Sequence, residues 1–111
     1  MMRKVELVAG DTLPNIDTTL QDGATGTAID LSNASDVIKF YFRLVGSTAT
    51  PTAITCTKPN GGSDGIVRIG WTAGQITAGE FDGEFEITYA SGKIQTVFEK
   101  IRLSVRSAIG P

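Results

Sequence analysis

The sequence contains no histidine and a single cysteine, Cys56, among its 111 residues. Histidine is the commonest general base and metal ligand near neutral pH, so its absence removes the usual acid–base catalysts and imidazole metal sites. One cysteine cannot form a disulfide within the chain, so the fold must be held together by packing alone. Cys56 also has no histidine to activate it, which makes a small core residue the favoured interpretation.

The chain also lacks any concentration of positive charge. Ten Lys and Arg residues stand against twelve Asp and Glu residues, which gives a formal net charge of -2. Nucleic acids and anionic membranes are recognised by clustered Lys and Arg, so neither is expected as a partner. No apolar run approaches the roughly 20 residues of a membrane helix. Glu6 and Asp11 interrupt the start of the chain, so we expect no signal peptide and infer synthesis in the cytoplasm.

Alternating apolar and polar residues dominate the last third of the chain. Between Glu84 and Tyr89 the apolar residues occupy every second position, which predicts a strand with one buried face. The loop Ala90–Lys93 then predicts a hairpin whose return strand buries Ile94, Thr96 and Phe98. A further run buries Ile101, Leu103 and Val105. Because the inward set passes from even to odd numbers, we expect a bulge or corner near Glu99–Lys100.

The same period of two recurs earlier in the chain, between turn signals rich in glycine. The further expected strands are Lys4–Ala9, Asn15–Leu20, Asp36–Val45, Ala53–Thr57 and Val67–Trp71. No long helical pattern and no internal repeat interrupts them. Together they predict one domain over residues 1–111, all-β, built as an antiparallel β-sandwich of about seven or eight short strands, with a small barrel as the alternative. The polar loops Gly46–Pro51 and Lys58–Gly65 are expected to be mobile.

Few residues are candidates for chemistry. The carboxylates of Asp82, Glu84 and Glu86 cluster, but on the solvent face of a strand, outside any predicted pocket. The other aspartates do not have the alternating spacing of a calcium loop, and the glycines of 61–65 lack the lysine and helix of a phosphate-binding loop. Trp71 could stack on a sugar, but its place in an alternating strand favours a core position. We therefore expect no catalytic residues, no metal and no cofactor.

Several segments, in order, resemble the N-terminal domain of phage baseplate upper proteins. The first three segments are Gly10–Pro14, Leu20–Gly23 and Ala28–Ala34, which are similar to that domain's opening strand, Asp-Gly turn and "Val-Asp-Leu-Thr-Gly-Ala" pattern. The strand Val37–Leu44 resembles its "Val-x-Phe-x-Leu/Met-Arg" strand, and Gly65–Trp71 resembles its "Gly-x-Val-x-Tyr-x-Trp". The most specific part is Gly79–Lys93, which reads GEFDGEFEITYASGK and resembles "Gly-x-Tyr-x-Gly-Glu-Phe-Glu-Val-Thr-Phe-x-Asp-Gly-Lys".

The resemblance implies an immunoglobulin-like sandwich that docks other virion proteins in a tailed phage or prophage. An enzyme is not expected, because the sequence has no histidine and no catalytic constellation. Baseplate upper proteins usually continue into a receptor-binding region, whereas this sequence ends at Pro111, so baseplate, tail, neck and head positions all stay open. The alternatives are a capsid decoration protein and a carbohydrate-binding module for the host surface.

The expected partner-binding residues lie at the chain ends and on one strand face. The first strand is terminal, so its edge is the leading candidate, and a net charge of -2 leaves self-association into a ring open. Tyr41 lies opposite the core face of its strand, and Ile109 has no strand to bury it. The full set is Lys4, Val5, Glu6, Leu7, Val8, Tyr41 and Ile109.

Overall fold

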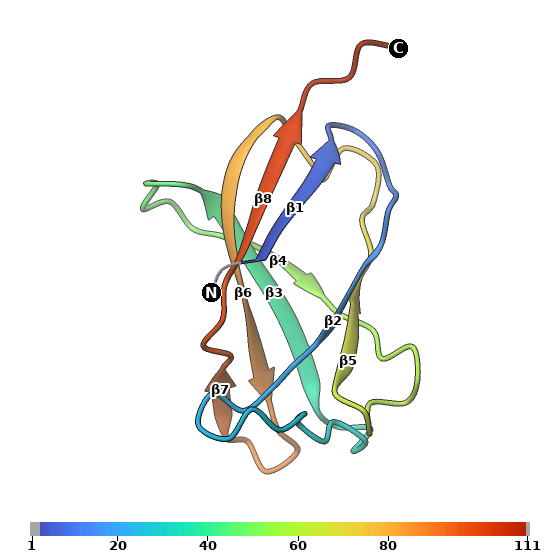
Figure 1. Ribbon diagram of the computed structural model, residues 1–111, viewed down its shortest axis with the longest axis vertical. Helices are drawn as coiled ribbons and strands as arrows, with labels where there is room; N and C mark the ends of the chain where they lie inside the picture. Colours follow the sequence, from blue (N-terminus) through green and yellow to red (C-terminus); the bar gives the residue numbers. More distant parts are fainter. Residues whose placement is uncertain (1–2, 111) are drawn as a thin grey trace.

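The computed structural model describes residues 3–110, and all regular secondary structure in that range is β-strand (Figure 1). No helix in this part of the chain could cross a membrane. The strands are β1 (Arg3–Val8), β2 (Ile16–Thr19), β3 (Val37–Leu44), β4 (Thr52–Thr55), β5 (Ile66–Ile69), β6 (Gly79–Thr88), β7 (Ile94–Thr96) and β8 (Ile101–Arg106).

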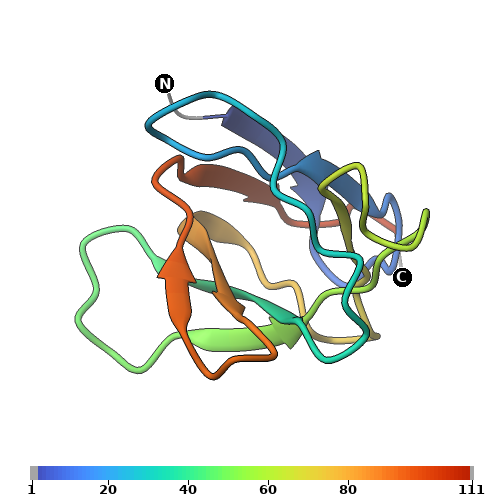
Figure 2. The same cartoon turned by 90° about the horizontal axis from the view of Figure 1, so that it is seen from below.

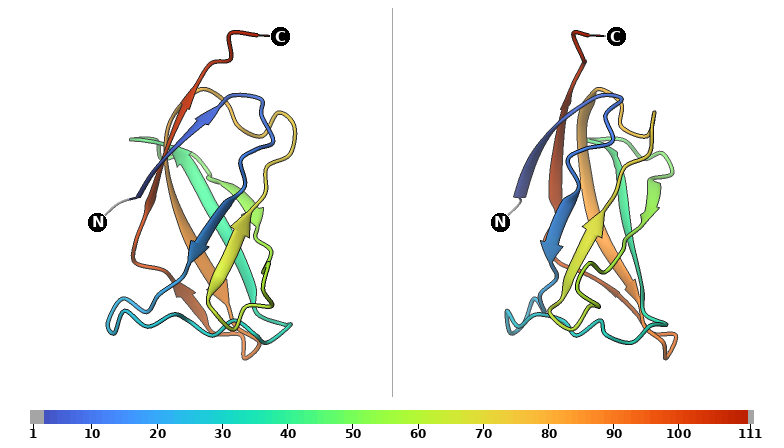
Figure 3. Two further views of the ribbon diagram at one scale, coloured as in Figure 1. Left: turned by 45° about the vertical axis from the view of Figure 1, so that its right-hand side comes forward. Right: turned by 90° about the vertical axis from the view of Figure 1, so that its right-hand side faces the viewer.

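The strands form two sheets that pack as an immunoglobulin-like β-sandwich. The large sheet has the order β1-β8-β6-β3-β4, with β7 also paired to β6, and the small sheet is β2-β5. This is the arrangement of an immunoglobulin domain, in which the G, F, C and C′ strands face a sheet containing B and E. Figure 2 shows the large sheet curving from β4 round to β1, and Figure 3 shows β2 and β5 across from it. One pair departs from the expected antiparallel pattern: β1 runs parallel to β8.

The core lies between the sheets and is built from the inward residues of the predicted strands. On β3 the buried side chains are Ile38, Phe40 and Phe42, and β6 faces them in register with Phe40 opposite Phe85. The small sheet contributes Ile16 from β2 and Val67 and Ile69 from β5, and Trp71 follows just after the end of β5. All the buried apolar residues of the described chain belong to one cluster. Trp71 is a core residue, as expected, and its indole N–H donates to the Pro14 carbonyl at 3.1 Å.

The return strand after the hairpin buries the opposite face from the one predicted. Ile94 and Phe98 are 65% and 90% exposed, whereas Val97 is buried. β7 and β8 pair with the same edge of β6, so they form one strand interrupted by a bulge. Thr96 pairs with Glu86 and Ile101 pairs with Gly83, so the two β6 residues between these partners lie opposite the four residues 97–100 of the other strand. Two extra residues leave the numbering of the inward positions unchanged, so Val97 before the bulge and Ile101 after it are both buried. The expected bulge near Glu99–Lys100 is therefore present, but the expected change of phase is wrong.

Two further details differ from the expectation. Leu44, placed on the buried face of β3, is 51% exposed because it lies at the end of the strand, where the chain turns away into Gly46. The chain after β4 also changes sheets: the Cys56 N–H still donates to Ile38 of β3, but Thr57 pairs with Arg68 of β5. This crossing closes one side of the sandwich.

Candidate functional site

The edge of β1 that faces away from β8 has no strand partner in residues 3–110. The N–H of Arg3 donates to the Lys100 carbonyl at 3.3 Å, and the N–H of Ala9 donates to the Arg106 carbonyl at 2.9 Å. Main-chain groups of a strand point alternately to its two sides. The main-chain groups of Arg3, Ala9 and the odd-numbered residues between them therefore point toward β8. The main-chain groups of the even-numbered residues point toward the free edge.

Lys4 and Glu6 consequently present both an N–H and a carbonyl to the free edge. The main chain of Val8 also points this way, but its carbonyl accepts the Asp11 N–H at 3.2 Å, so the Val8 N–H is the group left for a partner. A stretch of unpaired main-chain groups is a template for an added strand. The usable length of this template is from Lys4 to Val8.

The side chains of the five predicted β1 residues divide between the surface and the core. Lys4 and Glu6 are exposed, and Val5 and Val8 are partly buried. Leu7 is 4% exposed and belongs to the core cluster, so its side chain cannot contact a partner without opening the sandwich. Of these five residues, Lys4 and Glu6 offer their side chains to a neighbour at this edge, Val5 and Val8 do so in part, and Leu7 does not.

The other sheet edges are less open. The guanidinium of Arg3 donates to the Asp17 carbonyl at 3.2 Å and to the Thr18 hydroxyl at 2.9 Å, which caps the outer side of β2. The bridge between Thr57 and Arg68 occupies the outer side of β5. On the large sheet, the far edge is β4, which has four residues, whereas β1 has six. β1 is therefore the longest free edge in the described chain.

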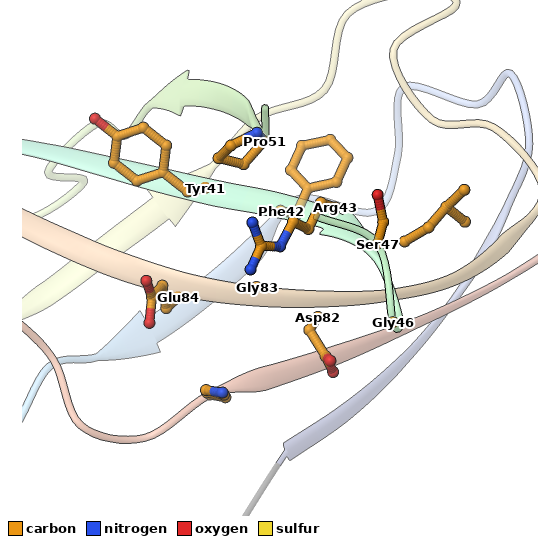
Figure 4. A pocket seen from close by; sticks show the side chains of 11 residues that line it. Tyr41, Phe42, Arg43, Gly46, Ser47, Pro51, Asp82, Gly83 and Glu84 are labelled. Atoms are coloured by element: carbon orange, nitrogen blue, oxygen red, sulfur yellow. The ribbon is translucent and has the colours of Figure 1, made fainter. Parts of the chain in front are cut away.

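Tyr41 lies in an open groove on the outer face of the large sheet. The groove has a volume of about 340 Å³ and runs between the β3–β4 loop and the bulge before β8. Figure 4 shows Tyr41 and Pro51 over β3 and β4, with the carboxylates of Asp82 and Glu84 over the neighbouring β6. Arg43 and Lys100 supply positive charge to the same groove. The alternation of its strand predicts that Tyr41 faces outward as a partner-binding candidate. The groove around it is formed by strand pairing, which the sequence does not show.

The carboxylates on this face stand opposite cations or tyrosine. Strand register places Asp82 opposite Arg43 and Glu84 opposite Tyr41. On its other side Asp82 accepts a hydrogen bond from Arg102 Nε at 2.9 Å. The cluster Asp82–Glu86 therefore lies on the solvent side of β6, as expected, and forms a ladder of alternating charge with its neighbours.

The two most exposed large apolar side chains of the described chain, Ile109 and Phe98, do not line the groove. Ile109 is 98% exposed, in the segment that leaves β8 at one end of the molecule (Figure 1). Phe98 is 90% exposed in the bulge, beside Gly23 of the β2–β3 connection. Sequence reasoning missed Phe98 because it assigned the residue to the core. Val97, Ile101, Leu103 and Val105 are buried, but the exposed Glu99 interrupts their alternation, so no continuous pattern in the sequence identifies Phe98 as exposed.

The other side chains considered for catalysis or metal binding are buried in the core or paired within the fold. Burial raises the pKa of the Cys56 thiol to about 12, so the thiol is protonated at neutral pH. Hydrogen bonding to Arg68 lowers the pKa of Asp17, and the two side chains form an ion pair of 2.8 Å that joins β2 to β5. Within residues 3–110, no group of three potential metal-ligating side chains comes together.

The aspartates outside the Asp82–Glu86 cluster that were considered for a calcium loop include Asp22, Asp30 and Asp36, and each accepts a main-chain N–H near a turn. Asp22 accepts the Ala24 N–H at 2.8 Å. Asp30 accepts the Ser32 N–H at 2.9 Å, and these bonds with Ser32 lower its pKa. Asp36 is the one buried charged residue in the described chain, and it accepts the Ala90 N–H at 2.9 Å.

A scan against protein-family models gives no match, and a search of the curated proteins returns no similar sequence. The features of this chain that bear on its function are therefore the motifs described above, the free edge of β1 and the groove around Tyr41.

Proposed function

We propose that this protein is a structural component of a tailed-phage or prophage particle, in which its immunoglobulin-like domain docks other virion proteins. The motifs that resemble baseplate upper proteins support this proposal, and the most specific of them, Gly79–Lys93, forms β6 and its hairpin. In this proposal the protein is made in the bacterial cytoplasm and becomes part of the virion. It acts by binding rather than by catalysis.

The observation that carries the proposal is the free edge of β1. Lys4 and Glu6 are exposed in both side chain and main chain, and the strand beneath them is fixed by a parallel ladder to β8. Strand addition at such an edge draws its affinity from main-chain hydrogen bonds and its specificity from alternate side chains. A preformed edge also costs little conformational entropy on binding.

The test of this proposal is the protein content of purified particles. Particles are induced, banded by density and analysed by quantitative mass spectrometry, with the major capsid protein as the internal standard. The proposal predicts a fixed copy number per particle, and loss of the gene should remove a recognisable substructure or block assembly. Separated heads and tails distinguish a baseplate, tail or neck protein from a capsid decoration protein. Absence from particles that assemble and infect normally would contradict the proposal.

The groove supports a second candidate function, which is binding of a host-surface carbohydrate. The ring of Tyr41 offers an apolar platform, and Glu84, Arg43 and Lys100 surround it with acceptors and donors for hydroxyl groups. Its volume of about 340 Å³ is at the small end of the range for ligand sites.

This second candidate is tested by binding of the purified protein to polysaccharide extracted from host cells. Tyr41→Ala should weaken the binding at least about tenfold, whereas Phe98→Ala, which removes an exposed aromatic outside the groove, should leave it unchanged. No binding by the wild-type protein, or an equal loss in both variants, would exclude the groove as a sugar site.

A further inference from the structure

We infer that the free edge of β1 binds the same edge of a second copy of this chain, as an antiparallel pair centred on Val5. This inference rests on the proposed assembly function and deepens it: the virion protein that pairs with the β1 edge is another copy of this chain. It follows from the order of charges along β1, which reads RKVELV over residues 3–8 and has main-chain groups free on one side. The two charged residues that face this free side are Lys4 and Glu6.

The main chain restricts which residues can face each other. In an antiparallel ladder, a hydrogen-bonded pair forms when both opposed residues point their N–H and carbonyl groups toward the partner strand. On β1 the even-numbered residues do so, because Arg3 and Ala9 donate to β8. Lys4 and Glu6 of one copy must therefore lie opposite even-numbered residues of the other copy.

Charge then selects one register among those that the main chain permits. A two-fold axis at Lys4 would oppose Lys4 to Lys4, and an axis at Glu6 would oppose Glu6 to Glu6, which places like charges directly across the strands. An axis at Val5 opposes Lys4 to Glu6 twice. Opposite charges in directly opposed positions stabilise a strand pair, whereas like charges destabilise it. The Val5-centred register therefore combines two charge pairs with four main-chain hydrogen bonds.

The symmetry of this arrangement defines the assembly. Because each copy uses the same surface, the interface is isologous and closes as a dimer rather than growing into a fibre. The two large sheets then become one sheet across the dimer, and the β4 edges lie at its two ends. A ring would need a second, different contact, such as the groove or Ile109. The β4 edge is a weaker candidate for self-pairing, because Thr52–Thr55 has no charge to set a register.

Charge exchange tests the register. The protein is studied with its native N-terminus by sedimentation velocity from about 10 μM to about 1 mM, since an interface of this size is at the weak end of the range. The wild-type protein should sediment increasingly as a dimer. Lys4→Glu and Glu6→Lys should each remain monomeric, because each places like charges opposite one another. An equimolar mixture of the two variants should restore the dimer, as should the double variant in a single chain.

Two controls separate the register from general charge effects and from misfolding. Lys93→Glu makes the same substitution as Lys4→Glu in the exposed β6–β7 turn, and it should dimerise like the wild type. The changed side chains are exposed, so thermal melts of all variants should match that of the wild type. A monomeric wild type at every concentration, or single variants that dimerise as well as the wild type, would overturn the inference.

Cysteine crosslinking gives an independent measure of the register. In the Val5-centred pair the two Val5 Cα atoms lie about 4.5 Å apart, within the range of a disulfide. Oxidised glutathione should therefore link Val5→Cys into a dimer. Glu6→Cys should stay monomeric, because its counterpart is the diagonal neighbour at about 7–8 Å. The opposite pattern would overturn the inference. Failure of the proposed virion function would appear separately, as absence of the protein from particles, and would not change these solution results.

Discussion

The ring of Phe40 lies at the centre of the core, between its strand neighbour Phe42 and the facing Phe85. Its ring centroid is 5.8 Å from that of Phe42 and 5.0 Å from that of Phe85. Phe42 in turn meets Trp71 edge-on at 5.8 Å and Phe81 at 5.7 Å. Such tilted and edge-on contacts add to the free energy of simple burial. These four phenylalanines all belong to the large sheet, and the edge-on contact between Phe42 and Trp71 joins them to the segment that follows β5 of the small sheet.

Replacing these core rings should be costly, whereas replacing Phe98 should not. Phe42→Ala and Phe85→Ala should each lower the free energy of unfolding by about 3–5 kcal/mol, because both side chains are buried. Phe98→Ala should change it by less than about 0.5 kcal/mol, since the ring is exposed. Urea denaturation of the three variants measures this contrast. A loss in Phe98→Ala comparable to the other two would mean that Phe98 packs in the core.

Gly83 is required for the position of Phe40. A Cβ atom at Gly83 would overlap the Phe40 ring, which lies across the bare backbone of β6. Gly83→Ala should therefore destabilise the protein by about 1–3 kcal/mol through overpacking, which lowers the melting temperature by roughly 4–8 °C for each kcal/mol. Gly110→Ala is the matched control, because a Cβ there meets no neighbouring atom within 4 Å. Equal melting temperatures for Gly83→Ala and the wild type would show that the ring can move without cost.

Cys56 should make stability depend on pH in the alkaline range. Its pKa is about 12 in the folded protein because of burial, and 9.0 is the ordinary value. The stability due to the neutral thiol is complete below the unfolded pKa and is lost as pH rises toward the folded pKa. Between about pH 8.5 and about 10.5, the wild type should lose about 1–2 kcal/mol more stability than Cys56→Ala. Identical losses for the two proteins in urea denaturation would show that the thiol is not shielded.

At the scale of elements, the strands with strict alternation could be predicted from the sequence, and β7 could not be placed correctly. Except for Leu44 at the end of β3, the apolar residues of β3, β5 and β6 lie on the expected faces, because burial on one side of a strand imposes a period of two. Around β7 the exposed Ile94 and Phe98 imitate that period on the wrong face. The bulge also keeps the phase, so the position of Val97 is apparent only from its pairing with β6.

The loops differ in a way that composition does not show. Lys58–Gly65 was expected to be mobile, but its Gly62 carbonyl accepts the Leu31 N–H at 2.8 Å and the Lys58 ammonium group donates to the Asn33 carbonyl at 2.8 Å. A Cβ at Gly62 would overlap the Leu31 carbonyl, so the glycine permits this close approach. The hydrogen bonds of Gly46–Pro51 are made within the β3–β4 hairpin, as in the bond from Ala49 N–H to Ser47 at 3.0 Å.

Hydrogen exchange should distinguish these two loops. We expect the amides of Gly46–Pro51 to exchange fastest, those of Gly61–Gly65 to exchange more slowly, and those of Phe85–Ile87 to be the slowest, because exchange follows the free energy of local opening. Mass spectrometry with peptide resolution measures all three segments in one experiment. Equal exchange in the two loops would mean that the hydrogen bonds of Lys58–Gly65 do not restrict it and that both loops are mobile, as their composition predicts.

At the scale of the whole molecule, the sequence predicts the sandwich but not which of its edges remain free. The parallel pairing of β1 with β8 joins the two ends of the chain, and no local pattern encodes it. That pairing decides that Leu7 belongs to the core and that Lys4 and Glu6 face outward. The groove around Tyr41 has the same origin, because it is formed by β3, β6 and segments distant in sequence.

The structure also changes how docking through β1 should be tested. Deleting residues 1–8 would remove Leu7 from the core and uncover β8, so a loss of function could follow from unfolding. Glu6→Pro is a narrower change. Its N–H points to the free edge, so proline removes a donor for a partner without removing a bond to β8.

The most direct test of assembly through β1 is a competition for places in the particle. Wild-type protein and Glu6→Pro are produced together in the host, and their ratio is measured by mass spectrometry in the lysate and in purified particles. We expect the variant to be depleted in particles by at least about tenfold, which corresponds to 1.4 kcal/mol of binding free energy, whereas Lys93→Glu is incorporated in proportion to its abundance. If Glu6→Pro folds and enters particles in the same ratio as in the lysate, the β1 edge is not the docking surface.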